Sequence, residues 1–325
     1  MKARTDFKEF YELLEKKEYF LLTSHQDPDG DSIGSLIGLN YFLKDLGKKT
    51  VVYNQGRLPN KYEFLDPAGD IWFTSQPVEF NPEVAIILEC PNIDRIGFVK
   101  DFITSDMILV NIDHHNRNSL FGDINYIDES ACAVAEILYH IIKLGGYKIT
   151  PEIAGAFYAG IASDTGRFKF SNTDAKCFKA VSELVEAGAN PKQISDKIFS
   201  SFSAGTIMLL GGILKNLRLY NDGSICVLTL TNDDLERNKV QVEDTEGIID
   251  YSLIIQGVKV GIMFKEIDMQ TVKIGLRSQN SIDISVYARQ KGGGGHPNAA
   301  GFTFNKPLDE AVTQTIAEVT EFLNG

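Results

Sequence analysis

A histidine and several carboxylates crowd into the turn HQDPDGD at residues 25–31. The apolar run YFLLTS before this turn is typical of a buried strand, and apolar residues return at helical spacing after it. Further polar clusters follow apolar stretches in the same way. Because ligands bind outside the carboxyl ends of parallel strands, we expect the clusters to converge on one crevice. In chain order they supply His25, Asp29 and Asp31, then Glu89, then Asp113, His114 and His115, and finally Asp164.

The residue types in these clusters indicate the chemistry. Carboxylates with a minority of imidazoles and no thiolate suit Mn²⁺ or Mg²⁺ better than structural zinc. Two such ions, roughly 3.5–4 Å apart, can activate a water molecule and neutralise the oxygens of a phosphoryl group. The sequence therefore predicts hydrolysis of a phosphate ester or anhydride.

Each cluster also has a structural interpretation. Acids in DPDGD are ordinary turn and N-cap residues, and Asp164 before Thr165 and Gly166 could cap a turn. A single metal site accounts for all the clusters together, whereas the structural interpretation needs a separate, independent reason for each cluster. His140 differs, because it lies within a predicted helix with no acidic or histidine partner in view, so we interpret it as structural.

The surrounding pattern is that of an α/β protein, with short apolar strands alternating with helices. Strands are predicted at residues 19–24, 49–54, 84–89 and 107–112, and helices near 131–145, 152–163 and 174–189. Longer strand patterns follow at 224–231, 252–267 and 271–278, and residues 308–323 form an amphipathic helical pattern. We expect an N-terminal, mostly parallel sheet with helices on both faces, and a smaller C-terminal α/β domain across a cleft. The expected boundaries are 1–191 for the first domain, 192–217 for a helical linker and 218–325 for the second domain.

Composition narrows the class of protein. A chain of 325 residues with 43% hydrophobic content can bury two cores, and a net charge of −12 argues against a broad basic surface for long nucleic-acid duplexes. The first 17 residues form a charged amphipathic helical pattern rather than a signal peptide, and no apolar run approaches the ~20 residues of a membrane span. The four cysteines show no CxxC spacing, which fits reduced thiols. A cytoplasmic protein without a membrane partner is expected.

A glycine-rich segment, RQKGGGGHPNAAG, is the main signal of the second domain. Glycines without side chains let the backbone approach a ligand and present N–H groups to an anion. Arg277 could add a bidentate phosphate contact. The alternative is a flexible linker. That alternative is less favoured, because linkers seldom contain a histidine and then AAG before an apolar FTF. The predicted substrate-binding residues here are Arg277, Gly293, Gly294, Gly295 and His296.

In family order, the motifs HQDPDGDSIGS, DHH, GIASDTGRF, LRS and GGGGHPNAAG resemble the DHH phosphoesterase superfamily with its DHH-associated C-terminal domain. In particular, they resemble the branch of nano-RNases and 3'-phosphoadenosine 5'-phosphate phosphatases, whose members prefer Mn²⁺ and release mononucleotides from very short oligonucleotides. The resemblance implies two metal ions. His25 and Asp29 would bind one ion, and Asp31, His114 and Asp164 the other, with Glu89 as the bridge.

The same resemblance gives Asp113 and His115 a catalytic role, supporting the site or contacting the scissile phosphate. It adds Arg95 and Ser278, which lie within family motifs, to the substrate-binding residues. One position departs from the family, because Glu89 in ECPNIDRIG stands where a pattern like DTANxxRIG has aspartate. Its extra methylene would alter the bridging geometry.

The expected activity is metal-dependent hydrolysis of short oligoribonucleotides from an end, with dephosphorylation of nucleotide 3'-phosphates as a second activity. Hydrolysis of cyclic or linear dinucleotides such as pApA is the alternative among enzymes, and cleavage of pyrophosphate or polyphosphate is less favoured. A nucleotide-binding protein whose metal site has decayed at Glu89 is the alternative outside enzymes. The expected partners are short RNA or nucleotides, with oligomeric state left open.

Overall fold

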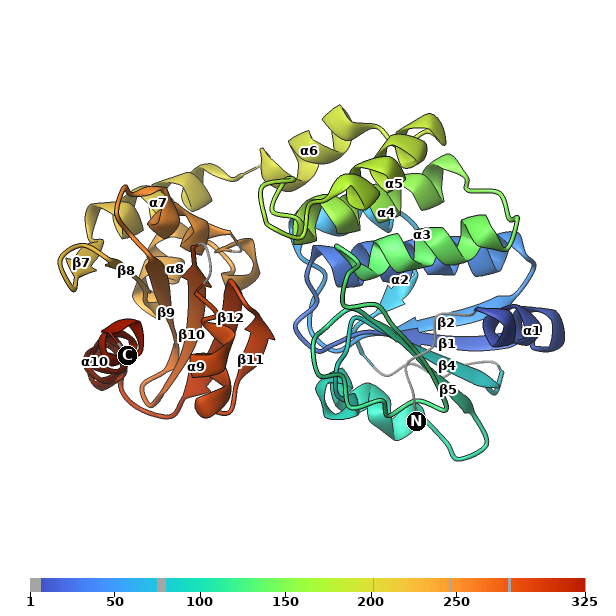
Figure 1. Ribbon diagram of the computed structural model, residues 1–325, viewed down its shortest axis with the longest axis horizontal. Helices are drawn as coiled ribbons and strands as arrows, with labels where there is room; N and C mark the ends of the chain where they lie inside the picture. Colours follow the sequence, from blue (N-terminus) through green and yellow to red (C-terminus); the bar gives the residue numbers. More distant parts are fainter. Residues whose placement is uncertain (1–6, 75–79, 201, 246, 280–281, 325) are drawn as a thin grey trace. The chain divides into compact units, whose positions relative to one another are not determined.

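The computed structural model describes residues 7–74, 80–200, 202–245, 247–279 and 282–324. The chain divides into two compact units, Met1–Ser201 and Phe202–Gly325, each built around its own six-stranded sheet (Figure 1). The expectation of two α/β domains is confirmed. The predicted linker region contains two helices, α6 (Pro191–Phe199) in the first unit and α7 (Ala204–Lys215) in the second.

The sheet of the first unit is parallel throughout, with the strand order β3-β2-β1-β4-β5-β6. Every residue of the central strand β4, VAIIL, is buried, as expected of a parallel strand covered on both faces. The strands are β1 (Tyr19–Thr23), β2 (Lys49–Tyr53), β3 (Ile71–Trp72), β4 (Val84–Leu88), β5 (Ile108–Asp113) and β6 (Ile124–Ile127).

One face of this sheet carries the α-helices, and the other face carries a 3₁₀ segment, η2 (Ile93–Phe102) (Figure 1). Helices α2 and α4 approach so closely that a Cβ atom at Gly34 would lie 2.5 Å from the carbonyl oxygen of Ala156. The η2 face is lined with aromatic rings, including those of Phe98 and Phe102. The other elements of this unit are α1 (Lys8–Lys16), α2 (Gly30–Asp45), η1 (Asn60–Leu65), α3 (Val134–Leu144), α4 (Pro151–Asp164) and α5 (Ala175–Glu186).

The strand order places β1 beside β4 in the middle of the sheet. From β1 the chain continues to β2 on one side, whereas β4 continues to β5 on the other, so the carboxyl ends of β1 and β4 flank a topological switch point. Crevices at such points are the usual ligand sites of open α/β sheets. The polar clusters that begin at His25 and Glu89 follow these two strands directly.

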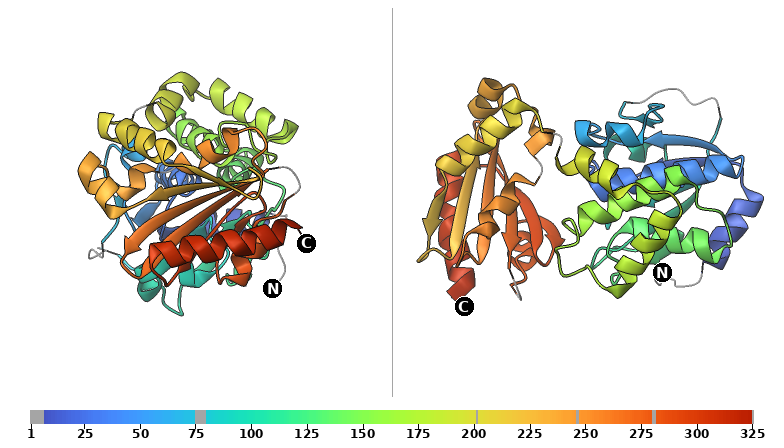
Figure 2. Two further views of the ribbon diagram at one scale, coloured as in Figure 1. Left: turned by 90° about the vertical axis from the view of Figure 1, so that its left-hand side faces the viewer. Right: turned by 90° about the horizontal axis from the view of Figure 1, so that it is seen from above.

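The sheet of the second unit is mixed, with the order β11-β12-β10-β9-β8-β7 and a single parallel pair, β8 with β9, among its described strands. Helices α9 and α10 pack on one face, and α7 with the 3₁₀ segment η4 packs on the other (Figure 2). The strands are β7 (Arg218–Tyr220), β8 (Ile225–Leu230), β9 (Val260–Asp268), β10 (Thr271–Ser278), β11 (Gly294–His296) and β12 (Ala299–Phe304), and the remaining elements are α8 (Asn232–Asn238), η3 (Val242–Thr245), η4 (Ile248–Ile254), α9 (Ser285–Gln290) and α10 (Leu308–Asn324).

The strand predicted at 252–267 was wrong in its first half. Residues up to Ile254 belong to η4, and β9 begins only at Val260. The apolar pattern arises because Leu253, Ile255 and Val258 pack in the hydrophobic cluster on this face of the sheet, and a turn with Gly257 at φ +90° separates the two elements.

No single helix among the described residues is long and apolar enough to cross a membrane, although α6 and α7 taken together have the necessary length and composition.

Candidate functional site

The turn between β1 and α2 positions His25 and Asp29. Asp29 is the N-cap residue of α2, and its Oδ1 accepts a hydrogen bond of 3.0 Å from the amide of Ser32. The capping interpretation is therefore correct, and it is compatible with a metal site because a carboxylate has further lone pairs. His25 is buried, and Asn54 fixes the turn by donating its side-chain amide to the carbonyl oxygen of His25 at 3.1 Å.

Glu89 lies at the centre of the site with only 2% of its surface exposed. Its Oε2 is 2.9 Å from Nε2 of His25, and its Oε1 is 3.5 Å from both Nε2 of His114 and Nδ1 of His115. Ser32 also donates its hydroxyl to Oε2 of Glu89 at 3.3 Å. The two carboxylate oxygens thus face histidines from two different clusters.

The backbone of Glu89 has φ +54°, a left-handed conformation that costs energy for a residue with a side chain. Directly after β4, this conformation starts the loop that leads into η2. Strained backbone in an ordered, buried residue is typical of functional positions. The sequence alone carried no signal of it.

Asp113 and His115 form a close pair at the end of β5. Nδ1 of His115 is 2.8 Å from Oδ1 of Asp113, which is fully buried. Asn118 donates to the other oxygen of Asp113 at 2.6 Å, so the carboxylate is held from both sides. Burial alone would lower the pKa of His115, but the charges of Glu89 and Asp113 raise it to about 9. The arrangement directs Nδ1 of His115 toward Asp113.

Asp31 and His114 are oriented by backbone groups at the start of α3. The amides of Val134 and Ala135 donate to Oδ2 and Oδ1 of Asp31 at 2.6 and 3.0 Å. Nδ1 of His114 is 3.0 Å from the carbonyl oxygen of Ala131, which can only accept, so Nδ1 must carry the hydrogen. Nε2 of His114 is therefore the nitrogen that faces the site.

Asp164 joins the same region from the last residue of α4. Its Oδ2 is 3.7 Å from Nε2 of His114. Asn172 donates to Oδ2 of Asp164 at 3.4 Å and to the carbonyl oxygen of Cys132 at 3.0 Å. The backbone of residues 131–135, which we call the 131–135 segment, thus supports Asp31, His114 and Asn172 together.

Glu136 fixes the 131–135 segment from within α3. It is 1% exposed, and its Oε2 accepts a hydrogen bond of 2.7 Å from the amide of Cys132. Its Oε1 is 3.5 Å from Nε2 of His140, so the expectation that His140 has no acidic partner was wrong. The helical spacing of four residues could have revealed this pair, and a glutamate three residues after the N-cap is a known capping signal.

We expect Glu136→Ala to lower the free energy of unfolding by about 1–3 kcal/mol, because the buried amide of Cys132 would lose its acceptor. Glu136→Gln should lose less, since its amide oxygen can still accept. Thermal and urea unfolding measure the effect. The exposed neighbour Glu129 supplies the control, and Glu129→Ala should change stability by less than about 0.5 kcal/mol. Equal stability of Glu136→Ala and Glu129→Ala would contradict the proposal that Glu136 fixes the 131–135 segment.

The electrostatics of the site fit a bound cation. Burial and the charge of Glu89 raise the pKa of Asp31 well above its usual value. Burial and the charges of Asp29 and Glu89 likewise raise the pKa of Asp164 to about 7, although His114 opposes the shift. These carboxylates repel one another's charge, and a cation between them would relieve the repulsion.

The donor geometry also fits a cation. Ligand atoms of His25, Asp29 and Glu89 all lie within 4.8 Å of one another, and so do those of Glu89, Asp113 and His115. Within the described part of the chain, the buried Nδ1 of His25 has no hydrogen-bond partner. These residues form a candidate divalent metal site of histidine and carboxylate ligands.

The remaining predicted substrate-binding residues lie in two places. Arg95 belongs to η2, and its carbonyl oxygen accepts a hydrogen bond of 2.7 Å from the amide of Gln26, which ties η2 to the His25 turn. In the second unit, Arg277 donates to Asp250 at 3.1 Å, and the hydroxyl of Ser278 donates to the carbonyl oxygen of Ile282 at 2.6 Å. Ser278 therefore also stabilises the fold of its own unit.

The glycine-rich segment proves to be partly a strand, because Gly294–His296 forms β11 and pairs with β12. A Cβ atom at Gly293 would lie 2.1 Å from the carbonyl oxygen of Gly301, and one at Gly295 would lie 2.4 Å from that of Ala299. Close strand packing thus explains these two glycines. A Cβ atom at Gly294 would meet open space, so a ligand could approach the backbone most closely at this residue.

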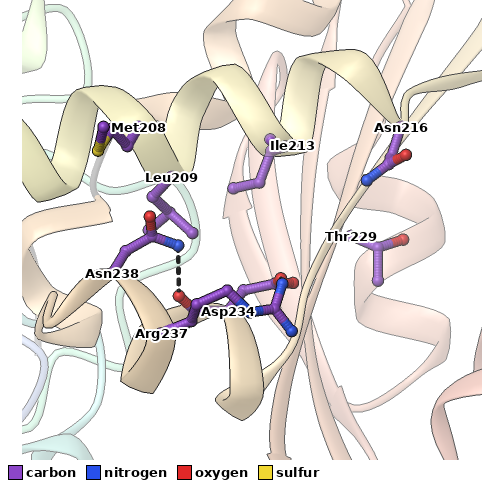
Figure 3. Close-up of a pocket in the computed structure, with 9 residues that line it drawn as sticks. Met208, Leu209, Ile213, Asn216, Thr229, Asp234, Arg237 and Asn238 are labelled. Carbon is purple, nitrogen blue, oxygen red and sulfur yellow. Dashed lines mark hydrogen bonds and ion pairs between the residues drawn. The ribbon is translucent and has the colours of Figure 1, made fainter.

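A separate pocket of about 230 Å³ lies between α7, α8 and β8 of the second unit (Figure 3). Leu209 and Ile213 form part of its wall, and Arg237 and Asp234 stand 3.6 Å apart at its polar side. The residues that line it include neither histidine nor cysteine. We therefore place the candidate chemistry in the first unit.

Comparisons with known proteins agree with this architecture. Residues 20–161 match the DHH family, N-terminal domain, and residues 222–325 match the DHHA1 domain. A Thermus thermophilus protein named bifunctional oligoribonuclease and PAP phosphatase NrnA is 30% identical over 303 residues, which cover 93% of this chain and 89% of that protein. The Bacillus subtilis protein of the same name is 28% identical, with 86% and 88% covered. The crystal structure of an exopolyphosphatase-related protein from Bacteroides fragilis has a TM-score of 0.89 at 27% identity, covering 98% of this chain and 97% of that one.

Proposed function

Because this chain belongs to the DHH family of phosphoesterases, we propose that it hydrolyses short oligoribonucleotides from an end and removes 3'-phosphates from nucleotides as a second activity. The observation that carries the proposal is the position of Glu89, whose two carboxylate oxygens face histidines from both halves of the metal cluster. Relatives named oligoribonuclease and PAP phosphatase, which match this chain over most of its length, support the choice of substrate.

In this proposal, His25 and Asp29 would hold one divalent cation, Asp31, His114 and Asp164 would hold a second, and Glu89 would contribute its carboxylate to both. The ions are Mn²⁺, with Mg²⁺ as the alternative, because the ligands are carboxylates and imidazoles without thiolate. When bound, they supply Lewis acidity and lower the pKa of water, which provides a nucleophile for phosphate esters.

The residues of the chain prepare the site for that chemistry. Backbone amides and the Ala131 carbonyl hold Asp31 and His114 in fixed orientations, so little reorganisation is needed when a phosphate enters. Asp113 fixes His115 through Nδ1 and leaves its Nε2 as the nitrogen that contacts the scissile phosphate. Glu89 offsets the mutual repulsion of two cations.

Arg277 and the backbone at Gly294, with His296, bind a terminal phosphate of the nucleotide in this proposal. Arg95 is assigned to the substrate as well, since η2 is tied to the His25 turn. For Arg277, hydrogen bonds from Nε to Asp250 and from Nη1 to the carbonyl oxygen of Leu276 keep the guanidinium oriented, while its other N–H groups are available to a phosphate. Ser278, at the end of β10, contributes by holding the carbonyl oxygen of Ile282.

A substrate panel with Mn²⁺ tests the function. We expect turnover of pApA and of other very short oligoribonucleotides, slower turnover of long RNA, release of phosphate from 3'-phosphoadenosine 5'-phosphate, and little hydrolysis of pyrophosphate. Arg277→Ala should raise KM for the nucleotides with a smaller effect on kcat. Preference for pyrophosphate, or no hydrolysis of any nucleotide, would refute the proposal. Rates on cyclic dinucleotides in the same panel decide the alternative among enzymes.

A further inference from the structure

The loop that follows Asp164 joins the candidate metal site to an exposed group of aromatic and basic side chains. It runs from the end of α4 to the start of α5, with the sequence TGRFKFSNTD at residues 165–174. Asn172 returns it to Asp164 through the contact of 3.4 Å. A ligand bound to this loop would therefore lie near Asp164 of the candidate site.

Two phenylalanine rings in this region are exposed. Phe170 is 40% exposed and Phe178, near the start of α5, is 53% exposed. The Phe170 ring packs on the backbone of Gly166, where a Cβ atom would come within 2.4 Å of its Cζ. The Phe178 ring stacks on Phe168, with centroids 5.7 Å apart and planes at 31°. Each ring is thus supported by the protein on one side and open to solvent elsewhere.

Two exposed cations alternate with the aromatic residues. Arg167 stands over the ring of Phe199 at 4.5 Å, which holds its guanidinium in place. Neither Arg167 nor Lys169 forms an ion pair with any residue that the structure describes, although the chain contains 44 aspartates and glutamates. These cations are therefore available to phosphates of a bound strand.

The loop is held in a strained conformation. Arg167 and Phe168 have consecutive positive φ angles of 62° and 63°. Thr165 stabilises them, because its hydroxyl accepts the amide of Phe168 at 3.1 Å and its carbonyl oxygen accepts the amide of Phe170 at 3.0 Å. Strain of this kind persists where function requires a fixed presentation of side chains.

From these observations, we propose that Phe170, Phe178, Arg167 and Lys169 form a base platform, on which nucleobases of a single-stranded oligoribonucleotide stack while the two cations contact its phosphates. The inference rests on the proposed function, since it assigns the substrate's bases to this site. Aromatic rings interleaved with basic residues bind single strands with little sequence preference, because every base has a π face. The platform thus lets the enzyme bind a single-stranded oligoribonucleotide without requiring a particular base sequence.

The test compares binding of two strands to the Mn²⁺-loaded protein by calorimetry. One strand is a triadenylate with phosphorothioate linkages that slow hydrolysis, and the other is the same strand with abasic riboses. We expect Phe170→Ala to weaken binding of the triadenylate about tenfold while leaving the abasic strand unchanged. Phe170→Trp should bind the triadenylate as well as the wild type. Arg167→Ala with Lys169→Ala should weaken both strands and reduce the salt dependence of binding.

Leu144→Ala, at the far end of α3, provides the control, because Leu144 is a 70% exposed apolar residue. Phe170→Leu with a thermal unfolding curve shows whether loss of the ring, rather than of the fold, is responsible. Equal binding of the triadenylate by wild type and Phe170→Ala, or equal losses on both strands, would overturn the platform. Hydrolysis of unmodified RNA by the wild type is scored separately, so binding without hydrolysis would refute the proposed function and leave the platform standing.

Discussion

Replacing Asp31 with alanine is expected to lower the rate of phosphodiester hydrolysis by about 10²–10³-fold, the range seen when one electrostatic contact to a transition state is removed. Asp31 is 1% exposed, and its carboxylate is fixed by the amides of Val134 and Ala135. Its loss removes a proposed metal ligand and leaves two helix-terminal amides without their acceptor. Single-turnover kinetics on pApA, at saturating Mn²⁺ and then over a Mn²⁺ titration, separate loss of rate from loss of affinity.

Asp27 provides the matched control for Asp31, because it is an exposed aspartate in the same turn. Asp27→Ala should keep wild-type kinetics and metal affinity. Since Asp31→Ala also costs stability, its unfolding curve must be recorded at the assay temperature. A folded Asp31→Ala protein that hydrolyses pApA at the wild-type rate would remove Asp31 from the site.

Replacing Glu89 with glutamine is expected to reduce both Mn²⁺ affinity and hydrolysis, each by at least about tenfold. The carboxylate lies among three histidines, which hold its pKa well below its usual range against the opposing effect of burial. It therefore carries a negative charge, and two neighbouring cations need such a charge between them. Calorimetric titration with Mn²⁺ gives the stoichiometry and affinity independently of turnover.

Glu89→Asp should behave in the opposite way and retain metal binding and activity. Aspartate tolerates the left-handed backbone at this position, φ +54°, better than glutamate does, so the substitution should also relieve strain. The exposed Glu129 is the control for a charge change elsewhere in the same unit. Two tightly bound Mn²⁺ ions and unreduced turnover in Glu89→Gln would show that another residue occupies the bridging position.

The sequence predicted the core of the first unit well because its strands are short apolar runs that end in polar turns. That pattern identified β1, β4 and β5 and brought His25, Glu89 and Asp113 to one edge of a parallel sheet. The error at residues 252–259 has a physical cause, since Leu253, Ile255 and Val258 pack in the same hydrophobic cluster as Met263 of β9, although they lie in η4 and the connection after it. Periodicity alone does not distinguish a short apolar run in a strand from one in such a connection.

The supporting contacts of the site were harder to predict. Asn118 reaches Asp113 through a loop whose conformation no motif encodes, and the strain at Glu89 follows from the junction of β4 with η2. The contacts of Asp31 and His114 are made to amide and carbonyl groups, which every residue possesses. Side-chain types can signal a metal ligand, but they cannot signal which peptide group will hold it.

The 131–135 segment, ACAVA, holds its three partners through peptide groups alone. The side chains of the segment are buried in the core of the first unit and take no part in these contacts, so the side-chain types alone do not reveal them. An alanine scan would also fail to detect these contacts, because residues 131, 133 and 135 are already alanine and the scan leaves every peptide group intact. Only chemistry that alters the backbone itself, such as an ester in place of the amide before Val134, would expose how much this stretch contributes.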